Sequence, residues 1–105
     1  MSGGSGPVID NTPVTDCSSI IEHTILNSPD PKVLSKLKVN DQLQLEAKTD
    51  RGPLVAIDSS GNIAGSITSG ILAQLLDCIK KGYKFIAIIE EMDGGKCKVE
   101  IRSSR

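Results

Sequence analysis

Strict alternation of polar and apolar residues in two short segments most constrains the fold of this chain. The alternation runs through residues 42–47, which read QLQLEA, and through residues 96–102, which read KCKVEIR. A period of two residues places apolar side chains on one face of a strand and polar ones on the other. Both segments are therefore predicted to be half-buried strands of a sheet with one wet face.

Further apolar segments and turn signals extend this sheet to six short strands. The continuous apolar run at 54–57 predicts a central strand, and the glycine-containing loop at 58–62 predicts a hairpin to a return strand at 63–67. Residues 83–91 predict another strand. Residues 19–27 fit either a strand or a helix, and their β-branched content favours the strand.

Two helices are expected beside the sheet. The longer covers about residues 69–81 and ends at Gly82, a left-handed stop. Its apolar stripe consists of Ile71, Leu72, Leu75, Leu76 and Ile79. The shorter covers about residues 31–38 and begins at Pro31 after the capping residue Asp30. The sequence thus predicts an α+β fold: a small, mainly antiparallel six-stranded barrel or curled sheet, with the long helix capping one end.

The length of 105 residues allows one domain. Residues 1–16, rich in Gly, Pro, Asp, Asn and Thr, are expected to form a flexible N-terminal arm, and residues 17–105 the single barrel domain. Whether the Gly/Ser-rich start is native stays open. Tyr83 and Phe85 are the aromatic residues, so the core must be mainly aliphatic.

Charge and cysteine usage favour a soluble cytoplasmic protein. The net charge is −1, whereas a domain that binds nucleic acid through phosphates usually has a basic excess. No apolar run is long enough for a transmembrane helix, and the N-terminus lacks the regions of a signal peptide. Cys17, Cys78 and Cys97 are odd in number and widely spaced, which favours reduced thiols.

Catalytic chemistry is not expected. Cys17 and the single histidine, His23, could form a thiol–imidazole pair, but a linker cysteine and a strand histidine are the preferred interpretation. Cys78 and Cys97 are interpreted as small core residues. The aspartates are dispersed, those in turns are expected to bond their own backbone, and Glu90 and Glu91 should face opposite ways. We therefore expect no enzyme, no metal site and no cofactor.

The order of motifs between about residues 39 and 91 resembles the HIRAN domain. The matching segments are VNDQLQL at 39–45, LVAI at 54–57 and GNIAGSI at 61–67, followed by a Leu-rich helix that ends at Gly82. The resemblance covers half of the chain. It implies an SH3- or OB-like small barrel, which in some members binds DNA ends.

Two departures from that pattern put the DNA contacts in doubt. The loop before the apolar strand, Thr49–Pro53, is shorter than the polar loop that meets DNA in the family, and it lacks the aromatic residue. Ser66 stands where His or Tyr is usual. Residues 24–29 and 94–97 also suggest a bacterial small-protein family of unknown function.

Basic residues give the best functional lead. Lys96, Lys98 and Arg102 should share the outer face of the last strand, and Arg51 lies on a loop. The first hypothesis is a non-catalytic binding module that contacts DNA or RNA ends through these four residues. The alternative is a protein-interaction or assembly subunit, in which the final strand is an exposed edge able to pair with a partner or a second copy. A membrane partner is not expected.

Overall fold

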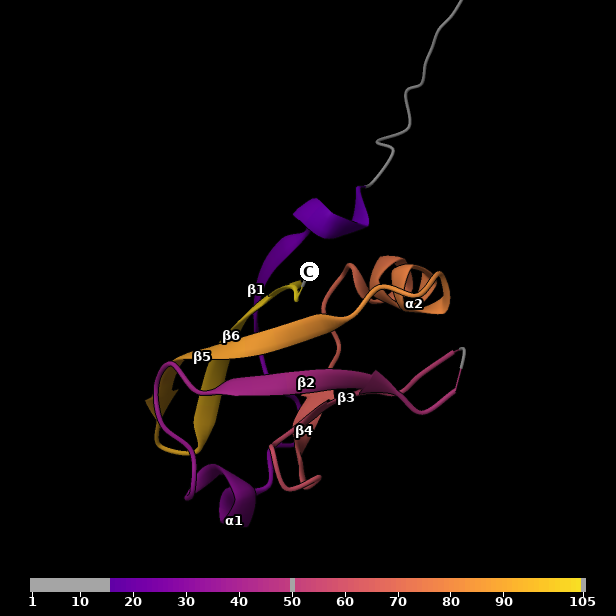
Figure 1. Ribbon diagram of the computed structural model, residues 1–105. Helices are drawn as coiled ribbons and strands as arrows, with labels where there is room; N and C mark the ends of the chain where they lie inside the picture. Colours follow the sequence, from indigo (N-terminus) through magenta and orange to yellow (C-terminus); the bar gives the residue numbers. More distant parts are fainter. Residues whose placement is uncertain (1–15, 50, 105) are drawn as a thin grey trace, which may run out of the picture.

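A six-stranded antiparallel sheet, curled into a half-barrel, forms the body of the computed structural model, which describes residues 16–49 and 51–104 (Figure 1). The strand order is β1-β6-β5-β2-β3-β4. The strands are β1 (Ile21–Ile25), β2 (Gln42–Ala47), β3 (Leu54–Ile57), β4 (Ile63–Ile67), β5 (Phe85–Asp93) and β6 (Lys96–Ser103). The helical elements are the 3₁₀ turn η2 (Cys17–Ser19), α1 (Pro31–Leu34) and α2 (Leu72–Lys80). The predicted α+β class and the curled antiparallel sheet are confirmed; the predicted arm, apart from Asp16, lies outside the described residues.

Two tight hairpins organise the sheet. Gly94 and Gly95 both have positive φ, 56° and 92°, which matches the two-residue turns that suit the twist of antiparallel strands. The β3–β4 loop is held by Asp58, whose Oδ1 accepts from the backbone N–H groups of Ser60 and Asn62, each at 2.9 Å. As predicted, this turn aspartate bonds its own backbone, and Gly61 supplies a positive φ of 88°.

The two edges of the sheet meet at a single bridge. The backbone N–H of Asn27, just past β1, donates to the Ser66 carbonyl of β4 at 2.8 Å, and the Ser66 N–H donates back at 2.9 Å. The chain approaches so closely here that a Cβ on Gly65 would lie 3.0 Å from Leu26 Cβ and 3.2 Å from the Asn27 carbonyl oxygen. This close approach of the two chain segments at Gly65 closes the curl of the sheet.

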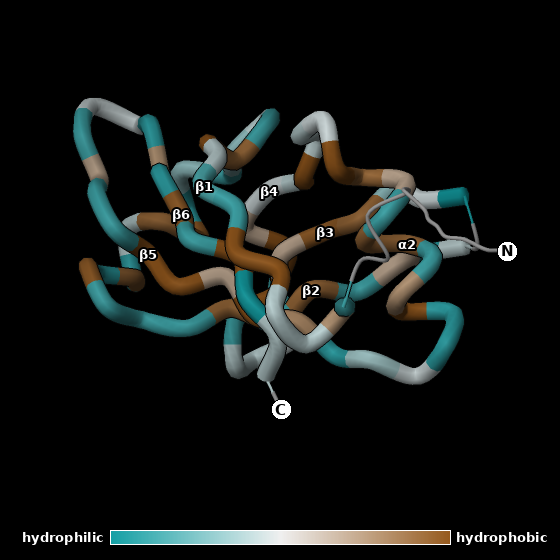
Figure 2. The backbone as a smooth tube through the Cα atoms, turned by 90° about the horizontal axis from the view of Figure 1, so that it is seen from above, coloured by the Kyte–Doolittle hydropathy of each residue, from teal (hydrophilic) through white to brown (hydrophobic). Residues whose placement is uncertain are grey.

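The interior is aliphatic, as expected from the scarcity of aromatic residues. Leu43, Leu54, Ile89 and Val99 have no exposed surface, and Phe85 is 1% exposed. Figure 2 shows apolar residues along the paired strands and hydrophilic ones at the turns. The core cluster comprises Cys17, Ile20, Leu26, Val33, Leu34, Leu43, Leu54, Ala56, Ala64, Ile67, Leu75, Cys78, Phe85, Ala87, Ile89, Cys97, Val99 and Ile101. Helix α2 contributes Leu75 and Cys78, so it shares the interior of the sheet.

Helix α2 is shorter than predicted at its N-terminal end. It begins at Leu72 because Ser69 forms a separate turn, its Oγ accepting from the Ile71 N–H at 3.3 Å, with Gly70 between. Its C-terminal end follows the prediction. Gly82 has a φ of 103°, and the Tyr83 N–H donates to the Cys78 carbonyl at 3.1 Å.

The short helix α1 also keeps its predicted start but not its length. The Lys32 N–H donates to Oδ1 of the capping residue Asp30 at 2.9 Å, and Pro31 occupies the first turn. The helix stops at Leu34, and the following residues continue as tight turns. In the described part of the chain, neither helix is long and apolar enough to cross a membrane.

The last strand, β6, is not an edge strand. The prediction that it is an exposed edge able to pair with a partner or a second copy is therefore wrong. β6 pairs with β1 on one side and with β5 on the other. Its alternating pattern predicted one wet face correctly, but a sequence pattern says nothing about the neighbours in the plane of the sheet. The outer strands are β1 and β4. A homodimer therefore cannot form by simple addition to β6, and dimerisation itself stays a prediction.

Replacing Gly65 with alanine tests the close approach at the bridge. We expect Gly65→Ala to lower the free energy of unfolding by about 1–3 kcal/mol, because the new methyl group must displace Leu26 or the Asn27 backbone. Urea unfolding followed by circular dichroism measures this. Gly70→Ala is the matched control: a Cβ there meets nothing within 4 Å. Equal stability of the two variants would contradict the bridge.

Candidate functional site

The predicted basic residues divide into two places. Lys96, Lys98 and Arg102 are all exposed on the outer face of β6, as the alternation predicted. Arg51 is exposed in the turn between β2 and β3. Because β5 and β2 separate β6 from that turn in the strand order, the structure does not line the four residues up along one strand.

Each cation on β6 also has an acidic neighbour. Lys96 is in register with Asp93, and Lys98 with Glu91, across the β5–β6 hairpin. Arg102 Nη1 lies 3.5 Å from Glu100 Oε2 on the same strand. This face is therefore charge-balanced, whereas binding to phosphates depends on an excess of cations.

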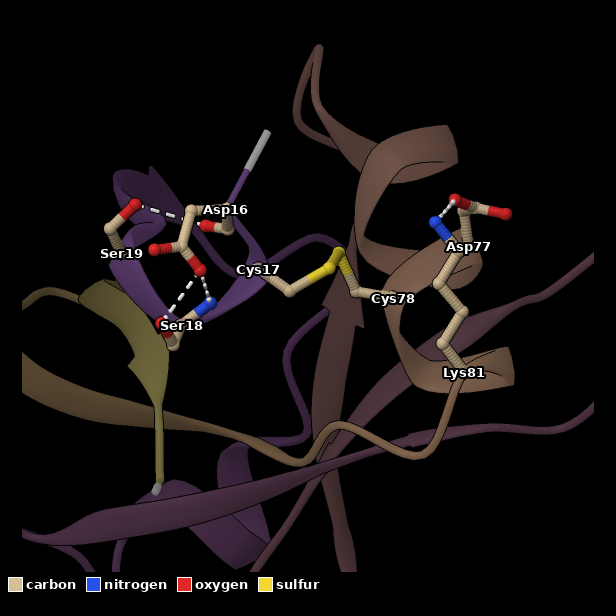
Figure 3. Close-up of a disulfide and its surroundings, with 7 residues drawn as sticks. All are labelled: Asp16, Cys17, Ser18, Ser19, Asp77, Cys78 and Lys81. Atoms are coloured by element: carbon tan, nitrogen blue, oxygen red, sulfur yellow. Dashed lines mark hydrogen bonds and ion pairs between the residues drawn. A yellow bond between two sulfur atoms is a disulfide. The ribbon is translucent and has the colours of Figure 1, made fainter. Parts of the chain in front are cut away.

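A disulfide joins Cys17 of η2 to Cys78 of α2, with an S–S distance of 2.06 Å and a Cα–Cα distance of 5.8 Å (Figure 3). The prediction of reduced thiols is wrong for these two cysteines. The prediction of a linker cysteine is also wrong, because Cys17 is 6% exposed and packs in the core cluster. The hypothesis of a reactive Cys17 paired with His23 is also wrong, because the Cys17 sulfur is already bonded to Cys78.

Local contacts position both ends of this disulfide. Asp16 caps η2: its Oδ1 accepts from the Ser18 hydroxyl at 2.7 Å and from the Ser18 N–H at 3.0 Å. These hydrogen bonds, the hydroxyl first, lower the pKa of Asp16 below its ordinary value. On the exposed side of α2, Lys81 Nζ lies 3.2 Å from Asp77 Oδ2, one turn apart. Figure 3 shows the cap and the ion pair on either side of the sulfur–sulfur bond.

The remaining cysteine, Cys97, is a buried free thiol on β6. Burial raises the pKa of its thiol, so the reactive thiolate is disfavoured. The prediction of a core cysteine is confirmed here.

A hollow of the described surface lies beside the point where β2 and β5 diverge. Their ladder ends at the pair Gln44 and Ile86, while β2 continues to Ala47. A groove of about 940 Å³ opens beside this divergence. Its lining comes from β2, the β3–β4 hairpin, the C-terminal end of α2 and the start of β5: Gln42, Gln44, Leu45, Glu46, Ala47, Lys48, Ile57, Asp58, Ser59, Gly61, Ile63, Ile79, Gly82, Tyr83, Lys84, Phe85, Ile86 and Ser104.

The groove combines apolar walls with charges of both signs. Leu45, Ala47 and Ile79 are only partly buried and pack against the core cluster, so they offer apolar surface to a ligand. Ile63 is 41% exposed and Tyr83 37%. The charged lining residues are the cations Lys48 and Lys84 and the anions Glu46 and Asp58. A smaller hollow of about 370 Å³ between the α1–β2 connection and the β3–β4 hairpin has a mostly polar lining.

The sequence does not predict this groove. The alternation in 42–47 predicts which side chains of β2 face inward, and the structure buries Leu43 accordingly. It cannot predict where a neighbouring strand leaves the ladder, because that depends on β5, which begins at Phe85.

A second group that the sequence analysis missed lies on the outer face of the sheet. His23 of β1, Glu90 of β5 and Glu100 of β6 place one possible ligand atom each within 4.8 Å of one another. His23 Nδ1 is 3.0 Å from each carboxylate oxygen of Glu90. The prediction that His23 is a strand residue is confirmed.

Comparison with known proteins gives no family for the chain: no family model, no curated protein and no solved structure matches it. The resemblance to the HIRAN domain therefore stays a prediction.

Reduction of the disulfide provides a test of its contribution to stability. The two cysteines are 61 residues apart, so opening the loop between them should lower the free energy of unfolding by about 4 kcal/mol. Urea unfolding with and without a phosphine reductant measures the difference.

The matched control is the double variant Cys17→Ala/Cys78→Ala, whose stability should not respond to the reductant. Thiol titration of the unfolded, unreduced protein should detect Cys97 alone. Titration of all three cysteines in protein purified without reductant would contradict the assignment.

Proposed function

We propose that this chain is a non-catalytic binding module whose ligand is an extended polypeptide segment, held in the groove that opens beside the end of the β2–β5 ladder. One observation carries the proposal: β2 runs on from Gln44 to Ala47 after its ladder with β5 has ended, beside a groove of about 940 Å³. This favours the protein-interaction hypothesis over the nucleic-acid hypothesis.

An extended peptide suits such a site because it can add to the free side of a strand. In β-strand addition, main-chain hydrogen bonds supply affinity and pockets for alternate side chains supply specificity. Leu45, Ala47 and Ile79 provide apolar surface for the inward-facing side chains of the ligand. The rim carries Lys48 and Lys84 against Glu46 and Asp58, a balance that fits a segment of low net charge better than a polyanion.

The nucleic-acid hypothesis has less support. The three β6 cations each face an acidic neighbour, and Arg51 lies on a separate turn. A phosphate backbone brought to β6 would also meet Asp93, Glu91 and Glu100.

The state of the cysteines supports a non-catalytic role, because neither Cys17 nor Cys97 offers a reactive thiol. Cys17 cannot act as a nucleophile while it is bonded to Cys78, and Cys97 is buried with a raised pKa.

The disulfide also bears on the compartment. Cytoplasmic location was expected on the premise of reduced thiols, and the Cys17–Cys78 bond removes that premise. Disulfides persist in oxidising compartments and are rare in the cytoplasm of mesophiles. We therefore propose an oxidising compartment as the location of the module.

Paired isoleucine substitutions test the groove. Peptides selected from a random library against the whole protein, held under non-reducing conditions, serve as probes. We expect Ile63→Asp to weaken peptide binding at least about tenfold, because it places a charge against the apolar wall. Ile21→Asp is the matched control: Ile21 is 55% exposed on β1 and does not line the groove. Fluorescence anisotropy of labelled peptides measures both affinities.

Amide NMR spectra locate the bound peptide, and we expect shifts at Leu45, Ala47 and Tyr83. Equal weakening by the two aspartate variants, or a library that yields no binder, would contradict the proposal. Salt-sensitive binding of DNA or RNA oligonucleotides, lost on Lys98→Glu, would instead support the nucleic-acid hypothesis.

A further inference from the structure

We propose that His23, Glu90 and Glu100 form a binding site for a divalent transition-metal ion such as Zn²⁺ on the outer face of β1, β6 and β5. The three residues come from three neighbouring strands. Their nearest ligand atoms all lie within 4.8 Å of one another. None of the three lines the groove proposed above for a peptide, so the inference is independent of that function.

Strand register brings the first two ligands together. His23 on β1 is directly opposite Glu100 on β6, so their side chains leave the sheet side by side. On the far side of Glu100 lies Ile88 of β5, which puts Glu90 two residues farther along that strand.

A β-bulge supplies the third ligand. The β5–β6 register shifts between Ile89 and Glu91, so that Ile89 pairs with Val99 and Glu91 pairs with Lys98. Glu90 is the extra residue of this irregularity and has no partner in the ladder. Bulges commonly re-aim a side chain. Here the shift pairs Glu91 with Lys98 and leaves Glu90 to reach His23, whose Nδ1 is 3.0 Å from both of its carboxylate oxygens. Glu90 and Glu91 therefore share the outer face, and the prediction that they face opposite ways is wrong because it assumed a regular strand.

The charges of this group favour a bound cation. Glu90 and Glu100 bring two carboxylates to one place, and like charges that close repel each other. Arg102, two residues farther along β6, places its Nη1 3.5 Å from Glu100 Oε2. A divalent ion between the carboxylates and the imidazole would offset the repulsion that remains.

The donor set selects the class of ion. One imidazole nitrogen with carboxylate oxygens suits Zn²⁺ and neighbouring first-row ions, whereas Ca²⁺ and Mg²⁺ prefer oxygen donors throughout. Bonds of about 2.0–2.2 Å put ligand atoms of a tetrahedral ion roughly 3.3 Å apart, close to the His23–Glu90 separation of 3.0 Å. On binding, the ion would take the place of any hydrogen on Nδ1 of His23, and the ring proton would then reside on Nε2.

The three side chains are exposed enough to shift their ligand atoms, which lie within 4.8 Å of one another, to the separation that a bound ion requires, and to admit water. The side chain of His23 is 53% exposed, that of Glu90 28% and that of Glu100 22%. The glutamates can therefore move closer to an ion without disturbing the core. Three protein ligands leave at least one coordination position for water or for a group from another molecule.

Calorimetric titration of the intact, disulfide-bonded protein with Zn²⁺ tests the site. We expect one ion per chain, with affinity reduced at least about tenfold by His23→Gln and by Glu90→Gln. Glu91→Gln is the matched control, because Glu91 is the neighbouring glutamate on β5 but pairs with Lys98. It should bind Zn²⁺ as the unaltered protein does.

Co²⁺ gives a second readout, since its visible absorption reports four- or five-coordinate binding with a nitrogen ligand. Circular dichroism confirms that the exposed substitutions leave the fold intact. Absence of Zn²⁺ binding up to millimolar concentration, or equal binding by the His23→Gln variant, would overturn the site. A stoichiometry that falls equally in Glu90→Gln and Glu91→Gln would show nonspecific binding to acidic residues and would overturn it too.

Discussion

Two backbone hydrogen bonds between Asn27 and Ser66 hold the two ends of the curled sheet together. They join the chain just beyond β1 to β4, the strand at the other end of the sheet order. A flat sheet would leave the apolar faces of β5 and β6 open to water, whereas the joined sheet encloses one aliphatic interior. Gly65 is required at this point because Leu26 and the Asn27 backbone occupy the space that a side chain would need.

The bridge between the ends of the sheet leaves the β2–β5 boundary as the place where neighbouring strands diverge. The β1–β6 and β5–β6 ladders are longer than the β2–β5 ladder, and the β1–β4 gap is bridged. The seam between β2 and β5 therefore opens where their ladder ends at Gln44. The groove extends from the end of this seam across β2 to the β3–β4 hairpin, with Ile79 of α2 in its wall. The disulfide ties α2 to η2 at Cys78, one residue before Ile79, and so fixes the helix that borders the groove.

Local features of the fold could be predicted from the sequence because local chemistry determines them. Asp30 and Pro31 begin α1, Gly82 ends α2, and the alternation in 42–47 orients β2. Only their extent was overestimated: α1 and α2 are both shorter than the predicted ranges.

The candidate sites could not be predicted, because each depends on residues far apart in the chain. Cys17 and Cys78 are 61 residues apart, and an odd cysteine count pointed away from a disulfide. His23 and Glu90 are 67 residues apart and meet through a bulge that no pattern signals. The interior position of β6 likewise follows from β1 pairing with it, not from its own sequence. Basic residues were visible in the sequence, but their acidic partners across the hairpin became clear only with the register.

Amide hydrogen exchange measured by NMR tests the closed sheet most directly. We expect the Asn27 and Ser66 amides, which donate across the bridge, to exchange as slowly as the Ile89 amide, which donates to the Asp41 carbonyl beside the β2–β5 seam. Exchange of Asn27 and Ser66 at the rate of an unstructured peptide, with Ile89 still protected, would contradict this expectation: the sheet would then be open between β1 and β4.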